Sequence, residues 1–205
     1  MARLPLTINK ISPTKVVISA ISARITPEQF FRLCSDNRDL QLELTARKEI
    51  VIMPPSGGET GARNLSIVTQ LAGWAKRDGT GIAFDADTGF TLPNGAVRGP
   101  DAAWIPRQKW HRLSKDQREK FAPICPDFVI ELRSPRDTVA ELKEKMAEYI
   151  ENGAQLGWLI NRKRREVFVY RPSRPVERLQ NPLSVSADPA LSGFVLDLTE
   201  VWDES

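Results

Sequence analysis

The sequence contains few of the residues that build thiol or histidine sites. Its two cysteines, Cys34 and Cys125, provide neither a disulfide framework nor the spacing of a zinc site. Its single histidine, His111, cannot form a histidine-rich metal centre. Any bound metal ion must therefore be held by oxygen atoms, which are the ligands that hard cations such as magnesium or manganese favour.

Long apolar runs and breaks in composition are also lacking. No stretch of the 205 residues approaches the roughly 20 apolar residues that a membrane span needs, and the N-terminus has no signal-peptide-like segment. We therefore expect no membrane partner and a cytoplasmic location. Because no repeat or low-complexity tract divides the chain, we expect one domain over residues 1–205, with a core over about 26–171 and a C-terminal extension over 172–205.

The overall charge is only mildly informative. With 41% hydrophobic and 27% charged residues, the composition is typical of a soluble globular protein. The net charge is +3 and the pI is near 9.0. This balance is compatible with a polyanionic partner, but it is too small to indicate one by itself.

The segment Pro126–Tyr149 places a carboxylate inside an apolar strand. Residues 127–132 are typical of a buried strand, and a glutamate at position 131 is costly there unless a cation meets it. Because side chains alternate across a strand, Glu131 shares a face with Val129 and Arg133. The cation could be a metal ion or a basic side chain.

A helix with clear ends follows this strand. Thr138 and Glu141 have the spacing of a capping box, and Asn152-Gly153 is a left-handed stop signal. Lys143 and Lys145 flank the apolar stripe of this helix, and either could reach the carboxylate. The alternative for Lys145 is an exposed pair with Glu141 one turn earlier, which contributes only about 0.3–0.5 kcal/mol.

The N-terminal part of the chain predicts a helix and a hairpin. Thr26–Gln29 opens a helix with a capping box and a proline at the first position. Leu40–Leu44 alternates with period two, and Glu49–Met53 is a second apolar run, so the two segments predict an antiparallel hairpin. Glu43 lies on the polar face of this hairpin, where we expect it to be solvated.

A second acid precedes the next predicted helix. Residues 54–61 form a loop rich in proline and glycine, and Ala62–Lys76 has helical periodicity before Gly79 ends it. Glu59 therefore stands just before a helix. Its position is explained equally well by the helix dipole and by a catalytic role.

A third acid enters a strand. Residues 82–84, 89–92 and 96–105 are strand-like, and Asn94-Gly95 is a strong hairpin signal between the last two. Asp101 lies in the third of these strands, between Pro100 and an apolar run. Taken alone, such a residue is more often a turn or edge aspartate than a functional one.

The C-terminal third predicts a hairpin with a cationic tip. Residues 156–160 and 166–170 are strands, and Asn161–Arg165 between them carries four cations that could contact phosphates. Residues 172–186 are proline-rich and loop-like.

Together, Glu59, Asp101, Glu131 and a lysine supply the groups that phosphodiester hydrolysis with a hard metal requires. Carboxylates hold one or two ions, and a cation orients water or stabilises the charge on the scissile phosphate.

Four segments resemble the Uma-type family of bacterial restriction-endonuclease-like proteins, within the PD-(D/E)xK nuclease superfamily. The resemblance spans roughly Asp39–Arg171. It implies an α/β restriction-endonuclease-like fold, in which helices flank a central mixed β-sheet with β-hairpins. It also implies metal-dependent hydrolysis of DNA and a homo-oligomer, most simply a dimer. The segments that carry it are Arg98–Ile105, Pro126–Pro135, Lys145–Tyr149 and Gly157–Ile160.

Carried over from the family, Asp101 and Glu131 are the metal-binding acids for Mg²⁺ or Mn²⁺, Lys145 is the catalytic lysine displaced onto the helix, and Glu59 is the catalytic acid of the first helix. The superfamily's usual lysine two residues after the strand acid is Arg133 here, which can hold a phosphate but cannot act as a base. The sequence thus predicts a magnesium-dependent endonuclease. The alternatives are an inactive nuclease-fold protein that binds nucleic acid or a protein partner, and a structural assembly module.

Overall fold

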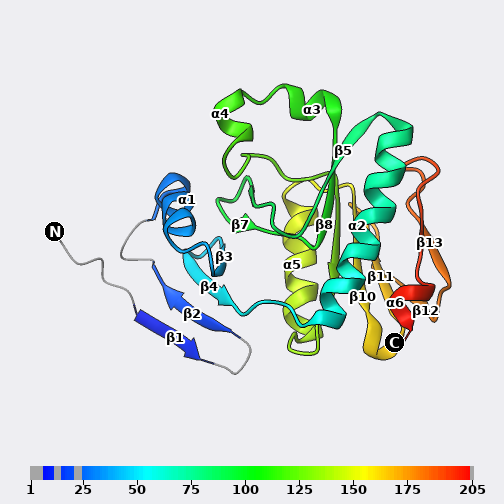
Figure 1. Ribbon diagram of the computed structural model, residues 1–205, viewed down its shortest axis with the longest axis horizontal. Helices are drawn as coiled ribbons and strands as arrows, with labels where there is room; N and C mark the ends of the chain where they lie inside the picture. Colours follow the sequence, from blue (N-terminus) through cyan, green and yellow to red (C-terminus); the bar gives the residue numbers. More distant parts are fainter. Residues whose placement is uncertain (1–6, 12–14, 21–24, 204–205) are drawn as a thin grey trace.

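The computed structural model describes residues 7–11, 15–20 and 25–203. In that part of the chain two six-stranded sheets lie side by side, with the N-terminal strands and α1 at one end of the molecule (Figure 1). The fold class expected from the sequence, an α/β restriction-endonuclease-like fold, is confirmed.

The first sheet is antiparallel and carries the predicted N-terminal hairpin. Its strands, in spatial order, are β1 (Thr7–Ile11), β2 (Val16–Ser19), β4 (Glu49–Met53), β3 (Gln41–Leu44), β7 (Val97–Arg98) and β6 (Phe90–Thr91). Helix α1 (Pro27–Asp36) begins at the predicted capping box, where the Thr26 hydroxyl accepts a hydrogen bond from the Gln29 N–H at 3.2 Å.

The second sheet is mixed and forms the centre of the fold. Its strands, in spatial order, are β12 (Glu177–Gln180), β11 (Glu166–Tyr170), β10 (Leu156–Asn161), β9 (Phe128–Leu132), β8 (Ala102–Pro106) and β5 (Gly81–Phe84). Strands β9 and β10 are parallel, and α5 (Val139–Glu151) connects them, as a parallel pair requires. The other neighbouring strands are antiparallel.

Helices cover both faces of the second sheet (Figure 1). Phe128, Ile130 and Leu132 pack in one cluster with residues of α2 (Gly58–Asp78) and α6 (Thr199–Trp202). Val129, from the same strand, packs on the opposite face with residues of α5. The alternation predicted for β9 is therefore correct, and it directs Glu131 toward α5.

Helix α5 lies close against β10 because one strand residue has no side chain. A Cβ atom at Gly157 would collide with the Met146 methyl group. Thr138 caps the helix, accepting from the Glu141 N–H at 3.3 Å, and Gly153 follows its end with a positive φ of 112°. The predicted ends and the close packing together fix which side chains of α5 face the sheet.

The prediction of one continuous strand over residues 96–105 is wrong, because the structure has two separate strands there. Val97–Arg98 pairs in the first sheet and Ala102–Pro106 pairs in the second. Pro100 has no N–H to donate to a ladder, which favours a break at this point. Asp101 consequently sits where the chain crosses between the sheets.

Two other boundaries also differ from expectation. Helix α2 begins at Gly58 rather than Ala62, so Glu59 lies inside its first turn. Residues 172–186, expected to be a loop, contain β12 and β13 (Ser184–Ser186), and β13 pairs with β14 (Val195–Asp197). The short helices α3 (Arg107–His111), α4 (Lys115–Arg118) and η2 (Arg162–Arg164) complete the elements.

Within the described ranges, no helix has both the length and the apolar character that crossing a membrane demands.

Candidate active site

Lys145 and Glu131 meet in the space between α5 and β9. The Lys145 Nζ lies 2.8 Å from the Glu131 Oε1. Tyr149, one helical turn after Lys145, donates its hydroxyl to the same oxygen at 3.1 Å. Only 4% of the Glu131 surface is exposed, so the strand acid that the sequence identified as costly does meet a basic side chain. Lys145 therefore does not form the exposed pair with Glu141 that was the alternative prediction.

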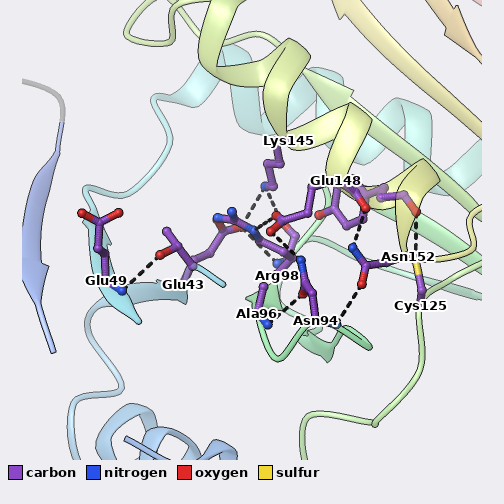
Figure 2. A network of polar contacts seen from close by, with 12 residues as sticks. Glu43, Glu49, Asn94, Ala96, Arg98, Cys125, Lys145, Glu148 and Asn152 are labelled. Carbon is purple, nitrogen blue, oxygen red and sulfur yellow. Dashed lines mark hydrogen bonds and ion pairs between the residues drawn. The ribbon is translucent and has the colours of Figure 1, made fainter. Parts of the chain in front are cut away.

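A second buried carboxylate, that of Glu43, joins this pair. Its Oε1 lies 2.7 Å from the Lys145 Nζ and accepts the Gly99 N–H at 3.1 Å, and its Oε2 lies 2.9 Å from the Arg98 Nη1. Arg98 in turn holds Glu148 at 2.6 Å. Figure 2 shows Glu43, Arg98, Lys145 and Glu148 converging from three different elements.

The prediction that Glu43 is solvated is therefore wrong, since only 5% of its surface is exposed. The pairing of Leu44 with Val97 brings β3 beside β7, and this places Glu43 next to Arg98. The charge of Glu43 is offset by two cations, which makes its burial tolerable. A glutamate between two leucines in a predicted strand was the available signal, but it does not reveal whether its own face is covered.

Asp101 lies at the edge of the same region and is fixed from both sides. Its Oδ2 accepts the Leu132 N–H at 2.7 Å, and its Oδ1 accepts the side-chain amide of Asn64 at 2.7 Å. Strand β8 begins one residue later and pairs with β9, Ala102 opposite Ile130. Asp101 therefore immediately precedes β8, the antiparallel neighbour of the strand that carries Glu131, whereas the sequence predicted that Asp101 would lie within the adjacent strand.

The buried acids of this cluster differ in the direction in which their pKa values are shifted. Burial, with the nearby carboxylates of Asp101 and Glu43, raises the pKa of Glu131 to about 8 in spite of Lys145. Burial would also raise the pKa of Glu43, but Lys145 and Arg98 outweigh it and lower that pKa to about 2. Burial raises the pKa of Asp101 as well. The two cations thus favour the carboxylate form of Glu43, whereas burial favours the protonated form of Glu131.

Lys145 remains an ammonium in this setting. Burial would lower the pKa of Lys145, but Glu131 and Glu43 outweigh it and raise that pKa. The Nζ also donates to the Gly99 carbonyl at 3.1 Å. The structure therefore holds a cation with fixed geometry beside two acids.

The raised pKa of Glu131 predicts how stability depends on pH. A folded-state pKa above the ordinary value of 4.5 adds stability that is fully present below that value and is lost as pH rises through about 8. We expect metal-free Glu131→Gln, which cannot titrate, to gain more than about 1 kcal/mol relative to the wild type between pH 5 and pH 8.5. Urea unfolding of both proteins in a chelating buffer measures this difference. A constant difference across the range would contradict the raised pKa.

A protein-family model matches most of the chain. The Uma2 model, described as "Putative restriction endonuclease", matches residues 27–199. The chain belongs to the Uma2 family. Membership supports a nuclease function, with nucleic acid as the substrate. Among curated proteins, a search finds no match to the chain.

A solved structure shows the same fold as this Uma2 protein. It is the crystal structure of a "putative nuclease belonging to DUF820" from Anabaena variabilis ATCC 29413, with a TM-score of 0.71 and 24% sequence identity. The match covers 87% of this chain and 97% of that chain. At this identity the likeness establishes the fold.

Glu59, the acid in the first turn of α2, does not join Asp101, Glu131 and Lys145. Glu59 is exposed and pairs with Arg63 at 3.1 Å and with Arg162 at 3.5 Å. Asn64, farther along the same helix, is the residue of α2 that contacts Asp101. The structure therefore brings Asp101, Glu131 and Lys145 into one region and leaves Glu59 outside their hydrogen-bond network.

The oxygen atoms around Asp101 and Glu131 suit a hard cation in their chemistry. Both side chains supply carboxylate oxygens. The Oδ1 of Asn64, whose Nδ2 contacts Asp101, is buried with no hydrogen-bond partner in the described part of the chain. Within that part, no three acidic, histidine or cysteine side chains are grouped to hold an ion. By its chemistry, a hard cation at this place would take its oxygen ligands from the two carboxylates and the Asn64 amide. Nothing in the sequence pattern around Asn64 had indicated it.

Proposed function

We propose that this protein is a Mg²⁺- or Mn²⁺-dependent endonuclease that hydrolyses phosphodiester bonds in DNA. The observation that carries the proposal is the contact of the Lys145 ammonium with Glu131 at 2.8 Å, on the strand next to Asp101. Two acids and a lysine in this order are the groups that the Uma-type resemblance assigns to the reaction.

Asp101 and Glu131 would hold the ion, with Asn64 able to add its amide oxygen. A bound divalent ion supplies Lewis acidity toward the phosphate and lowers the pKa of a water molecule. Glu131 must lose its proton to act as a ligand, because metal binding requires the carboxylate form. That proton would pass to solvent, and the Lys145 ammonium, 2.8 Å away, would stabilise the negative charge left on Glu131.

Lys145 would stabilise the negative charge that develops on the scissile phosphate. Its three N–H donors contact Glu43, Glu131 and the Gly99 carbonyl, so Lys145 would act on the phosphate through its positive charge rather than through a further hydrogen bond. Glu43 has the role of a positioning residue, because it remains ionised and holds the ammonium in place. Such preorganised charge is usually a large part of catalysis.

Cleavage of supercoiled plasmid DNA tests the function directly. We expect the wild type to nick or linearise the plasmid with Mg²⁺ and to do neither with a chelator. Asp101→Asn should lose more than about 100-fold in rate, beyond the 10–100-fold typical of groups that only support a metal ligand. Asparagine can still accept the Leu132 N–H, so folding should persist. Equal cleavage by the variant would refute the proposal.

We assign Glu59 a supporting role at the periphery, in which it orients Arg63 and Arg162. Because exposed ion pairs contribute about 0–1 kcal/mol, Glu59→Gln should reduce plasmid cleavage by less than about tenfold. Single-turnover rates measure this effect. A loss as large as that of Asp101→Asn would instead make Glu59 a catalytic residue.

The replacement of the superfamily's strand lysine by Arg133 favours a second candidate, a nuclease-fold protein that binds nucleic acid without cutting it. That protein would retain salt-sensitive DNA binding in the presence of a chelator and after removal of the Glu131 carboxylate. The same plasmid assay separates the two candidates, because only the endonuclease changes the topology of the plasmid.

A further inference from the structure

A pocket of about 430 Å³ opens on the face of the second sheet that also carries α5. It lies beyond the Glu43–Lys145–Glu131 network and shares none of its residues. Cationic side chains from four different elements or loops line it, namely Arg133, Lys143, Lys163, Arg164 and Arg178.

The pocket is close to the candidate active site along the strand direction. Arg133 follows Glu131 by two residues and shares its face, so their Cα atoms are about 6.6 Å apart. Strands β9 and β10 are parallel, with Glu131 opposite Leu159, so Asn161 extends to the same end of the sheet as Arg133. A DNA strand bound at the candidate active site would therefore pass close to the pocket.

The charge of the pocket is mostly uncompensated. Glu166 is its one acidic lining residue, and Arg178, Gln180 and Asn161 already bind that carboxylate. Across the described ranges, no acidic side chain pairs with Lys163 or Arg164, both of which are exposed. Apart from Arg178, which binds Glu166, four cationic side chains remain in the pocket: Arg133, Lys143, Lys163 and Arg164. Their charge favours the binding of an anion.

The floor of the pocket holds one of these cations rigidly. Asn161, which is 1% exposed, accepts from the Arg133 Nη1 at 3.2 Å and donates to Glu166 at 3.2 Å. The Arg133 Nε donates to the Asp137 carbonyl at 3.1 Å. The guanidinium is thereby fixed through neutral acceptors, which leave its positive charge available. A fixed planar guanidinium is well suited to bind a phosphate.

We propose that this pocket binds a backbone phosphate of DNA, next to the bond that is cut. The proposal rests on the function proposed above for the choice of DNA. It gives Arg133 a role that differs from that of Lys145, because Arg133 positions the substrate strand while Lys145 acts at the scissile phosphate.

Binding of a fluorescein-labelled 20-base-pair duplex tests the proposal without any need for cleavage. In a chelating buffer at several salt concentrations, the double variant Lys163→Ala/Arg164→Ala should bind at least about tenfold more weakly than the wild type. The slope of its binding constant against salt concentration should flatten by about 0.9 for each phosphate that the variant no longer neutralises. Arg133→Lys, which keeps the positive charge but loses the planar guanidinium, should also weaken binding.

Lys76→Ala/Arg77→Ala is the matched control, because it removes the same charge from exposed positions. Those residues lie in the last turn of α2, about 25 Å along the helix axis from Glu59, which contacts Arg162. The control should bind within about twofold of the wild type. Equal losses in both double variants, or no loss in Lys163→Ala/Arg164→Ala, would overturn the proposal. If the wild type never cuts DNA but the binding pattern holds, the endonuclease function fails and the phosphate pocket stands.

Discussion

Glu131→Gln is expected to lose plasmid cleavage by more than about 100-fold while it keeps the fold. Glutamine retains an oxygen that can accept from Lys145 and Tyr149, the two contacts that Glu131 makes. Because burial favours the protonated form of Glu131, a neutral amide is tolerated at this position. A neutral amide, however, cannot supply the carboxylate that the ion requires.

Two controls make this result specific. Glu144→Gln, an exposed position on α5, should cut plasmid at the wild-type rate. Urea unfolding at neutral pH should show that Glu131→Gln is at least as stable as the wild type. Cleavage by Glu131→Gln within tenfold of the wild type would mean that the carboxylate is not a metal ligand.

Lys145→Met is expected to destabilise the protein by about 3–5 kcal/mol at neutral pH, the usual cost of removing one partner from a buried ion pair. The change would leave Glu43 ionised and buried with Arg98 as its remaining cation, since the pKa of Glu43 is lowered to about 2. It would also remove the ammonium that binds Glu131. Denaturant unfolding measures the free energy.

Lys143→Met is the matched control for this prediction, because it lies on the same helix but is exposed. Its ammonium is 4.3 Å from the centre of the Phe168 ring, a contact that contributes about 0.5–1 kcal/mol at such a position. We therefore expect a loss of at most about 1 kcal/mol for this control. If the two variants were equally stable, Lys145 would not be the cation that makes the buried acids tolerable.

The sequence predicted the elements whose signals are local. The capping residues Thr26 and Thr138 mark the starts of α1 and α5, and Gly79 ends α2. The apolar run around Glu131 gave both the strand and the need for a nearby cation. These features depend on a few neighbouring residues, so the chain itself contains the information.

The choice between Lys143 and Lys145 could not be made in the same way. The two residues are separated by about 200° around a helix, so only one can reach Glu131. Packing of Met146 against Gly157 selects the rotation of α5 that buries Lys145. That packing joins residues from different elements and leaves no local trace in the sequence.

Glu43 and Asn64 were missed for the same physical reason. Period-two alternation assigns Glu43 to a face, but only the distant strand β7 determines that this face is covered. Asn64 is one polar residue on a long helix, and its contact with Asp101 depends on how α2 crosses the sheet. The position of Asp101 was predicted more closely, although Pro100 separates it from the strand that was expected to include it.

Anomalous diffraction from crystals soaked in manganese tests the central claim most directly, because it locates an ion without reference to any reaction. The account predicts a peak bounded by the carboxylates of Asp101 and Glu131 in the wild type, and no peak there in Glu131→Gln. A wild-type crystal saturated with manganese that shows no peak between these two side chains would contradict it.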